Sequence, residues 1–297
     1  MTKDHFMEQI TKQLQKRYSD MGWGIEQDTI LKNNDVVRHA VIICPPDSSI
    51  TPTIYMDDYY TDYIEQRSTL PEIVNQICLL ADMAQKEMPR FKEFAFDFDS
   101  CKSAIFFQLI SKERNKQLLE DCPYLPFLDL AITFHVVFRQ TQNAMESVRI
   151  TNTLLDMWQK NTKDLMKLAQ ENTPRIFPPH LERLDKVLAD YAKMHPLKHD
   201  IEGQSPLLML SNNRGIQGAT AILYKDLMRG LAEKYCTNFY LIPSSIHEFL
   251  LLPEEQAESL QSISELVRQV NHERVNEEDI LSDHAYFYNC KDNQFSY

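Results

Sequence analysis

The sequence of 297 residues predicts an α+β protein with antiparallel or mixed sheets, helices packed on them, and two possible lobes. Strand pairs alternate with single helices without a steady β-α-β rhythm, which argues against a doubly wound parallel sheet. Only six glycines are present, and none lies between Gly24 and Gly203. Most of the chain therefore has no phosphate-cradling glycine loop of the Rossmann, Walker or kinase type.

The N-terminal third predicts helices around one strand pair. The first nineteen residues form an amphipathic pattern with four large residues on one face: Phe6, Ile10, Leu14 and Tyr18. Two extended runs, Ile25–Leu31 and Val36–Cys44, flank the predicted hairpin turn Lys32–Asp35, because Asn and Asp tolerate left-handed backbone. A further extended run, Ile50–Met56, precedes a helix expected to begin near Asp57.

A second helix is predicted from Thr69, where Thr-Leu-Pro-Glu has the form of a capping box with proline in the first turn. Four apolar residues of this helix are expected to face inward: Ile73, Ile77, Leu80 and Met83.

The middle of the chain reads as mixed structure. Strands are expected at Ala104–Ile110, Leu128–Phe138 and Ser147–Thr151, and helices at Ser111–Asp121, Thr153–Glu171 and Leu181–Met194. Pro174, Pro178 and Pro179 are expected to form a rigid break before the last of these helices. The segment Cys122–Pro126 is the best candidate boundary, which divides the chain into lobes 1–122 and 123–297. One continuous domain is the alternative.

The last hundred residues alternate more regularly. Expected strands are Leu207–Leu210, Ala219–Tyr224, Asn238–Ile242 and Glu248–Leu252, with a turn at Asn212–Gly215 where Gly215 supplies a positive φ. Expected helices are Lys225–Lys234 and a long one over Pro253–Val270. A terminal hairpin is expected over His284–Tyr297, turning at Lys291-Asp292-Asn293.

The composition narrows the class of function. The formal net charge is −12, and residues 51–100 (net −6) and 247–297 (net −8) hold the excess of acids. A chain without a basic stripe is a poor match for nucleic acid or for anionic lipid. Because there is no secretory signal, no apolar stretch of the roughly 20 residues that span a bilayer, and no C-x-x-C pair among six cysteines, we expect an acidic cytoplasmic protein with reduced thiols.

Two short motifs suggest chemistry. Tyr55-Met56-Asp57-Asp58 is the tetrapeptide with which reverse transcriptases hold magnesium, so Asp57 and Asp58 are candidate metal ligands. The sequence lacks the upstream carboxylate and basic channel of a polymerase, and the two acids also suit the start of a helix. The second motif, Ser244-Ser245-Ile246-His247-Glu248, contains the residue types of nucleophilic acyl transfer.

Four candidate catalytic residues come from that second motif: Ser244, Ser245, His247 and Glu248. The sequence has no G-x-S-x-G elbow, and in an extended strand Glu248 lies on the opposite face from Ser245 and His247. A turn between two strands, with the hydroxyls bonded to loop backbone, is therefore the favoured interpretation.

Other groups of polar residues give weaker hypotheses. His195 and His199 are separated by a helix-breaking proline, whereas His272-Glu273 and Asp283-His284 are pairs that folding can bring together. The loop Asn212–Gly218 offers backbone amides for an anion, although a turn is the simpler interpretation. Four glutamates on or before the long helix form either a solvated face or a docking surface for a basic partner: Glu254, Glu255, Glu258 and Glu265.

Four segments occur in an order that resembles a known family. They are Thr51–Tyr60, Asn172–Arg175, Ile242–Glu248 and Leu281–Tyr288. This order resembles a bacterial domain-of-unknown-function family, number fifty-six eighty-eight, over about residues 36–288. The resemblance implies one co-occurring unit that is not a polymerase. The family has no assigned activity, so the resemblance transfers no catalytic residue.

These observations favour a non-enzymatic binding or regulatory protein with an unknown protein or small-molecule partner, and no cofactor, nucleic acid or membrane. The acidic C-terminal helix and the segment Asp57–Tyr63 are candidate contact surfaces. The alternative is a hydrolase-like enzyme that uses Ser244 or Ser245 with His247, or a metal at Asp57 and Asp58. Side chains that converge on a pocket favour the enzyme, and side chains bonded to backbone favour the binding protein.

Overall fold

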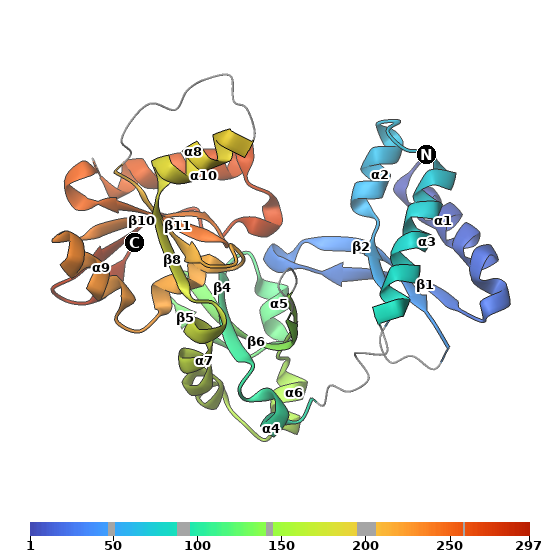
Figure 1. The fold of residues 1–297 in the computed structure, drawn as a ribbon, viewed down its shortest axis with the longest axis horizontal. Helices are drawn as coiled ribbons and strands as arrows, with labels where there is room; N and C mark the ends of the chain where they lie inside the picture. The colour runs from blue at the N-terminus through green and yellow to red at the C-terminus, as the bar shows by residue number, and fades with distance from the viewer. Residues whose placement is uncertain (47–50, 88–95, 141–144, 195–205, 258) are drawn as a thin grey trace. The chain divides into compact units, whose positions relative to one another are not determined.

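The computed structural model describes residues 1–46, 51–87, 96–140, 145–194, 206–257 and 259–297. It confirms the predicted α+β class, with 45% helix, 29% strand and three antiparallel sheets with helices packed on them (Figure 1). The chain forms two compact units. The first comprises Met1–Lys32 and Val36–Ala95, and the second comprises Asn33–Asp35 and Phe96–Tyr297.

The first unit is a three-stranded sheet with helices on it. Its sheet has the order β1-β2-β3, and β1 and β2 pair in register from Gly24 with Cys44 to Leu31 with Val37. The elements are α1 (Lys3–Tyr18), η1 (Ser19–Met21), β1 (Gly24–Leu31), β2 (Val37–Cys44), β3 (Thr53–Tyr55), α2 (Asp57–Ile64) and α3 (Leu70–Glu87). The N-terminal helix, the hairpin and the helix at Asp57 are thus confirmed.

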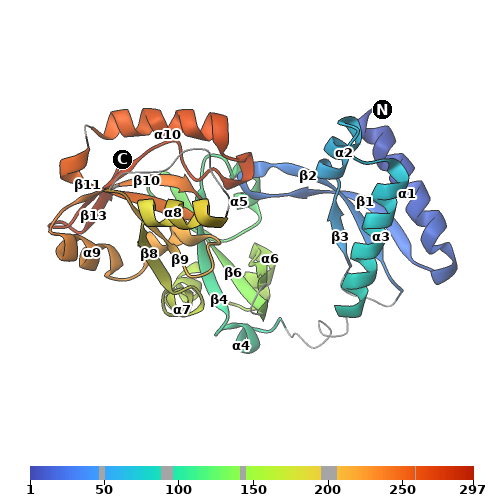
Figure 2. The same ribbon diagram turned by 45° about the horizontal axis from the view of Figure 1, so that its top comes forward.

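Helices α1 and α3 share the core of this unit with the sheet (Figure 2). Phe6, Ile10 and Leu14 of α1 are fully buried, as predicted. Ile73 and Ile77 of α3 are buried too, but Leu80 is 46% exposed and Met83 is 64% exposed, so their predicted inward position is wrong. At 100° per residue the buried stripe runs through Ile73, Val74, Ile77, Cys78 and Ala81, which leaves Met83 outside it.

The second unit contains two sheets. Strand β6 is the centre of the four-stranded sheet, because β4 pairs with one edge of it and β5 and β7 pair with it as well. The strands of this sheet are β4 (Ile105–Ser111), β5 (Tyr124–Phe127), β6 (Leu130–Gln140) and β7 (Met145–Arg149). The helices around it are α4 (Phe98–Cys101), α5 (Lys116–Glu120), α6 (Asn152–Met157) and α7 (Thr162–Ile176).

The six-stranded sheet has the order β13-β12-β10-β11-β9-β8 and is antiparallel throughout. Its strands are β8 (Pro179–Arg183), β9 (Leu208–Asn212), β10 (Phe239–Ser245), β11 (Glu248–Pro253), β12 (Tyr286–Asn289) and β13 (Gln294–Ser296). The accompanying helices are α8 (Leu184–Met194), η4 (Gly218–Leu223), α9 (Leu227–Tyr235), η5 (Glu254–Gln256), α10 (Leu260–Arg274) and η6 (Glu277–Asp279). The terminal hairpin is therefore confirmed, and α10 packs against β10.

Two threonines cover the edge of β4 that does not pair with β6. The backbone N–H of Phe107 donates to Thr173 Oγ1 of α7 at 3.1 Å, and the N–H of Leu109 donates to Thr220 Oγ1 of η4 at 3.1 Å. Both threonines are buried, so these side chains satisfy backbone donors that water cannot reach. These bonds tie the free edge of β4 to α7 and η4.

Several expected boundaries are wrong. Residues 219–224 do not form a strand but fall in and just after the 3₁₀ helix η4, and β8 was not predicted. Pro174 lies within the last turn of α7, and the helix expected at Ser111–Asp121 is reduced to α5. The long C-terminal helix begins at Leu260, capped by Ser259, and not at Pro253. The Ser259 hydroxyl accepts the Ser262 N–H at 3.1 Å, which caps this start.

The segment Cys122–Pro126, the expected boundary, lies inside the second unit, where Tyr124–Phe127 is β5. The division into independent domains stays a prediction. In the part of the chain that the structure describes, no helix combines the length and apolar character needed to span a bilayer.

Candidate functional site

Asp57 and Asp58 begin α2, as one interpretation of the Tyr-Met-Asp-Asp motif predicted. Asp57 Oδ1 lies 2.5 Å from Lys3 Nζ, and Asp57 Oδ2 accepts a hydrogen bond from the backbone N–H of His39 at 3.0 Å. Asp58 has a side chain that is 91% exposed, and its Oδ1 lies 3.8 Å from Arg38 Nη1. The two carboxylates therefore have different protein partners.

Electrostatics agree with a structural role for Asp57. Burial alone would raise the pKa of Asp57, but the Lys3 ammonium and the His39 N–H hold it below the usual value of an aspartate. Among the residues that the structure describes, no three His, Cys, Asp or Glu side chains form a group that could hold a metal ion. As a metal ligand, Asp57 would have to exchange its bond with Lys3 for the ion.

The Ser244–Glu248 segment forms the tight turn of the β10–β11 hairpin. The Ser245 hydroxyl accepts the backbone N–H of His247 at 3.0 Å and donates to Glu248 Oε1 at 3.3 Å. Ser245 is only 9% exposed, whereas Ser244 precedes it on the strand and is half-buried. The structure therefore brings Ser245 to Glu248, and the Ser245 hydroxyl bonds the backbone of His247.

The imidazole of His247 has partners at both nitrogens. Its Nδ1 accepts the backbone N–H of Gln217 at 3.1 Å, and its Nε2 lies 3.4 Å from Asp279 Oδ1. Since Nδ1 accepts, the neutral ring carries its proton on Nε2 and points it at the carboxylate. Nδ1 therefore has no lone pair left to take a proton from a serine hydroxyl. The imidazole instead ties the hairpin turn to η6.

The Asn172–Arg175 motif is a clamp on the segment before β4. Asn172 Nδ2 donates to the carbonyls of Lys102 and Ile105, both at 2.9 Å, and Arg175 Nη2 donates to the carbonyl of Ser103. Thr173 donates to Ala169 O in its own helix and accepts the Phe107 N–H described above. Every polar side chain of this motif is thus used to hold backbone.

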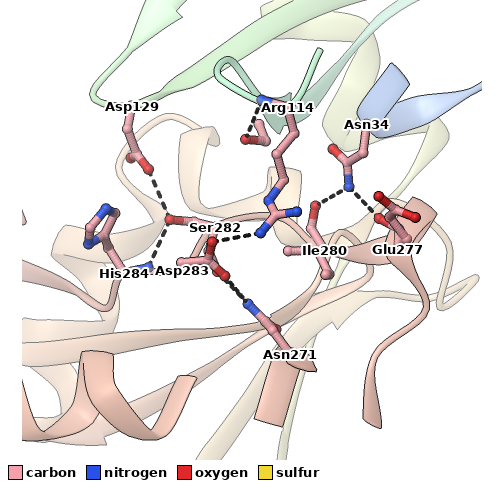
Figure 3. Close-up of polar contacts among 10 residues, drawn as sticks. Asn34, Arg114, Asp129, Asn271, Glu277, Ile280, Ser282, Asp283 and His284 are labelled. Atoms are coloured by element: carbon pink, nitrogen blue, oxygen red, sulfur yellow. Dashed lines mark hydrogen bonds and ion pairs between the residues drawn. The ribbon is translucent and has the colours of Figure 1, made fainter. Parts of the chain in front are cut away.

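The segment Leu281–Tyr288 is different, because its polar side chains meet residues from distant parts of the second unit (Figure 3). Asp283 Oδ2 lies 2.7 Å from Arg114 Nη2, and Asp283 Oδ1 accepts from Asn271 Nδ2 at 2.9 Å. Asn271 also donates to the Ser282 carbonyl at 3.0 Å. Burial alone would raise the pKa of Asp283, but Asn271 and Arg114 lower it below its usual range.

On the other side of the same segment, Asp129 accepts hydrogen bonds from two hydroxyl groups. Ser282 Oγ donates to Asp129 Oδ2 at 2.9 Å, and the Tyr286 hydroxyl donates to Asp129 Oδ1 at 2.7 Å. Ser282 Oγ also accepts the backbone N–H of His284 at 3.0 Å, so its geometry is fixed (Figure 3). Burial and the nearby carboxylate raise the pKa of Tyr286, which therefore stays a hydrogen-bond donor.

The turn Asn33–Asp35 belongs to the second unit and holds its loops. Asn34 Nδ2 donates to the carbonyls of Glu277 and Ile280, at 2.6 and 2.7 Å (Figure 3). Asn33 Nδ2 donates to the carbonyl of Glu278 at 2.6 Å. The φ angles of Asn34 (61°) and Asp35 (52°) confirm the predicted left-handed turn. These bonds fix η6 beside the Ser282–Asp283 segment.

A pocket of about 490 Å³ opens beside the Arg114–Asp283 ion pair. Arg268 and His272, four residues apart on α10, line it together with Asn271 and Glu277. Within the described ranges of the chain, neither the Arg268 guanidinium nor the His272 imidazole has a hydrogen bond or an ion pair. One side of the pocket therefore consists of the hydrogen-bonded residues Arg114, Asn271 and Asp283. The guanidinium and the imidazole on α10 also line it but have no partner among the described residues.

The other candidates have local explanations or lie elsewhere. Glu254 accepts from Asn238 and Glu255 from Thr237, so these two acids brace the end of the hairpin from η5. Asn212 Oδ1 accepts the Arg214 N–H at 2.9 Å, and Gly215 has the predicted positive φ of 64°, which makes that loop a turn. His195, His199 and Glu258 lie outside the described residues.

Sequence reasoning paired Asp283 with His284 and His272 with Glu273, and the structure places His272 and Asp283 at one pocket. The ring of His284 lies instead 5.6 Å from that of Tyr297. The contributions of Arg114, Asp129 and Asn271 were missed. Each lies at least eleven positions from its partner in the Ser282–Asp283 segment, so no local spacing indicates it.

Comparisons with known proteins identify the family. A search of curated proteins and a search of solved structures each found no match. The family model DUF5688, described as a family of unknown function, matches residues 3–290 and so covers all four segments. The chain belongs to the family of unknown function DUF5688.

Proposed function

We propose that this protein is a non-enzymatic binding protein whose second unit takes a small ligand carrying an oxyanion, such as a carboxylate or phosphate. The observation that carries this proposal is the pair Arg268 and His272, which lines a pocket without a hydrogen bond or ion pair to any described residue. The volume of about 490 Å³ is in the range of small-molecule sites.

The charges around the pocket indicate where the oxyanion binds. Arg114 and Asp283 neutralise each other at 2.7 Å, and Asn271 fixes the carboxylate from the other side. This leaves the guanidinium of Arg268 as the uncompensated cation and Glu277 as an opposing acid. An Arg fork matches the geometry of carboxylate and phosphate oxygens, and His272 adds a second donor one turn away.

The helix dipole explains only part of this arrangement. A basic residue in the last turn of a helix, such as His272, is stabilised by the carbonyl ends. Arg268 lies more than a turn before the end of α10 at Arg274, where that effect has faded. The Arg268 side chain is exposed, so its guanidinium is free to contact a ligand in the pocket that it lines.

The non-enzymatic part of the proposal is supported by the state of the hydrolase candidates. The Ser245 hydroxyl bonds the His247 N–H and Glu248, and His247 Nδ1 accepts a backbone N–H. A serine nucleophile needs a histidine nitrogen within hydrogen-bond reach to take its proton. Here both groups brace a hairpin turn. The cytoplasmic location and a regulatory role stay predictions.

Titration calorimetry at low ionic strength tests the proposed pocket, with inorganic phosphate and malonate as separate probes. We expect Arg268→Gln to weaken binding about 10- to 100-fold, because a hydrogen bond to a charged group contributes about 1.5–3 kcal/mol. Glu277→Gln should strengthen it, since an opposing charge is removed. The two probes separate a phosphate site from a carboxylate site.

Arg274→Gln is the matched control, because it removes one cation from the same helix at a position that does not line the pocket. Equal weakening by Arg268→Gln and Arg274→Gln would mean that only the general charge of α10 attracts the anion. That result, or no binding of either probe by the unmodified protein, contradicts the proposal.

A further inference from the structure

A second pocket of the second unit, about 660 Å³ in volume, lies between α5 and the turn that joins β5 to β6. Leu119 of α5 is 8% exposed and supplies part of its apolar lining together with Leu128. Tyr124 and Tyr297 add two aromatic side chains. A concave site with an apolar lining and a few fixed polar groups is the usual form of a small-molecule site.

The polar group in this pocket is the carboxylate of Asp129. It is held by the hydroxyls of Ser282 and Tyr286, which are 3% and 1% exposed. These two bonds use only part of the four acceptor sites of a carboxylate. Asp129 is thus a preorganised acceptor, and within the described residues it has no ion pair.

The backbone beside Asp129 is strained. Leu128 and Asp129 form the two-residue turn between Phe127 and Leu130, and Leu128 has a φ of 55°. Residues other than glycine rarely adopt this left-handed conformation. Where bulky ones do, they are often found at ligand sites. Both residues of this turn, Leu128 and Asp129, line the pocket.

The remaining charges of the pocket cancel. Lys112 and Lys116 line it together with Glu113 and Glu120, so two formal positive charges face two negative ones. Asp129 then leaves the lining with a net negative charge. A cationic ligand fits this balance, whereas an anionic one would meet an uncompensated carboxylate.

The aromatic rings favour an organic cation over a metal ion. The ring of Tyr297 lies 5.6 Å from the ring of His284 and 5.9 Å from that of Tyr286, and Tyr297 itself is 55% exposed. A ring face attracts an ammonium group through its negative quadrupole. No group of three metal-ligating side chains occurs among the described residues.

From these contacts we propose that the pocket between α5 and the Leu128–Asp129 turn binds a small organic ammonium cation. The carboxylate of Asp129 provides the counter-charge, and Tyr124 and Tyr297 provide the aromatic walls. This site is separate from the oxyanion pocket at Arg268, and its own probes test it.

The experiment compares choline with its uncharged isostere 3,3-dimethylbutan-1-ol, added to the full chain while amide shifts are followed by NMR. We expect choline to saturate and to move the amide signals of Leu128 and Tyr297. The alcohol should bind at least about tenfold more weakly, since it lacks the charge that the carboxylate and the rings attract. Asp129→Asn should weaken choline binding about tenfold or more, because it removes the charge that attracts the ammonium group. Tyr297→Ala should weaken it about two- to fivefold.

Asp292→Asn and Tyr235→Ala are the matched controls, because each changes an exposed residue of the second unit that does not line the pocket. If Asp129→Asn fails to fold, the isostere pair and Tyr297→Ala still decide. The proposal is overturned if choline and the alcohol bind equally well. It is also overturned if the pocket variants leave choline binding unchanged, or if choline does not bind at all. Phosphate binding at Arg268 is measured separately, so either proposal can fail alone.

Discussion

Asn34 and Asn115 are joined by two hydrogen bonds inside the second unit. The backbone N–H of Asn34 donates to Asn115 Oδ1 at 2.7 Å, and Asn115 Nδ2 donates to Asn34 Oδ1 at 2.9 Å. Both side chains are buried, with 7% and 0% exposure. Because Asn34 also holds Glu277 and Ile280, this pair connects the loop before α5 to the loop that ends at the Ser282–Asp283 segment.

Substitution of Asn34 separates side-chain bonding from backbone strain. We expect Asn34→Gly to lower the free energy of unfolding by about 2–3 kcal/mol, because buried groups lose their partners. Asn34→Ala should cost about 1 kcal/mol more, since its φ of 61° suits glycine and not alanine. Both losses of free energy are measured by urea titration in a Trp23→Phe background. The fluorescence of Trp158, the remaining tryptophan, then reports unfolding of the second unit. A Gly variant as stable as the unmodified protein would contradict the role of the pair.

The edge of β4 gives a second prediction. Thr173→Val keeps the shape of the side chain but leaves the Phe107 N–H buried without its acceptor. We expect a loss of about 1–3 kcal/mol in the free energy of unfolding. Thr173→Ser retains the hydroxyl and is the matched variant, so it should lose less than Thr173→Val. Equal losses would show that packing of the methyl group dominates, and thermal unfolding of the three proteins distinguishes the outcomes.

Local pattern predicted local structure in this chain. The Asn-Asn-Asp turn was predicted because those residues tolerate left-handed backbone, and Glu72 accepts the Thr69 N–H as a capping box requires. The contacts that the sequence does not predict are those between residues far apart in the chain. No spacing rule indicates that Asn34 bonds Ile280, which lies 246 positions away, or that Arg114 meets Asp283, 169 positions away.

The candidate site shows the same limit. The resemblance to a known family includes Leu281–Tyr288, but the residue types of a catalytic motif occur instead at Ser245 and His247. The structure gives those residues hydrogen bonds within a hairpin turn and places the polar pocket around Asp283. Residue type alone does not distinguish a hydroxyl that bonds backbone from one that reacts.

A glycine pair tests the packing at the hairpin turn. A Cβ at Gly218 would lie 2.1 Å from Ser211 Oγ and 2.4 Å from the His247 carbonyl, whereas one at Gly230 meets nothing within 4 Å. We expect Gly218→Ala to destabilise the protein by about 2–4 kcal/mol through overpacking. Gly230→Ala, inside α9, should stabilise it by about 0.5–1 kcal/mol. Melting temperatures that shift in the same direction for both variants would contradict this account.

The Arg114–Asp283 pair predicts an acid-dependent term in stability. The folded state lowers the pKa of Asp283, so the bond stabilises the protein above the unfolded pKa of about 3.9 and is lost as pH falls through the lower folded value. At pH 7 we expect Asp283→Asn to cost about 1–2 kcal/mol, allowing for solvent screening of a half-buried pair. The difference from the unmodified protein should shrink below about pH 4. A constant difference across this range would exclude the ionised bond.

His135 predicts a different window of pH. It is 7% exposed, its Nε2 lies 3.2 Å from Thr133 Oγ1, and burial together with the charge of Arg149 lowers its pKa to about 3. The unfolded chain takes up a proton at about pH 6.5, whereas the folded protein does not, so stability falls by about 1.4 kcal/mol for each pH unit below that value.

We therefore expect the unmodified protein to lose about 2–3 kcal/mol more than His135→Gln between pH 6.5 and about 4.5 in urea titrations. His272→Gln is the matched control, because it removes an exposed histidine of the same unit and leaves the buried His135 unchanged. Because the Asp283 term begins only below about pH 4, the two contributions separate on the pH axis. If His135→Gln loses stability with falling pH as steeply as the unmodified protein does, burial of the His135 imidazole is not the cause of the loss. That result would contradict this prediction.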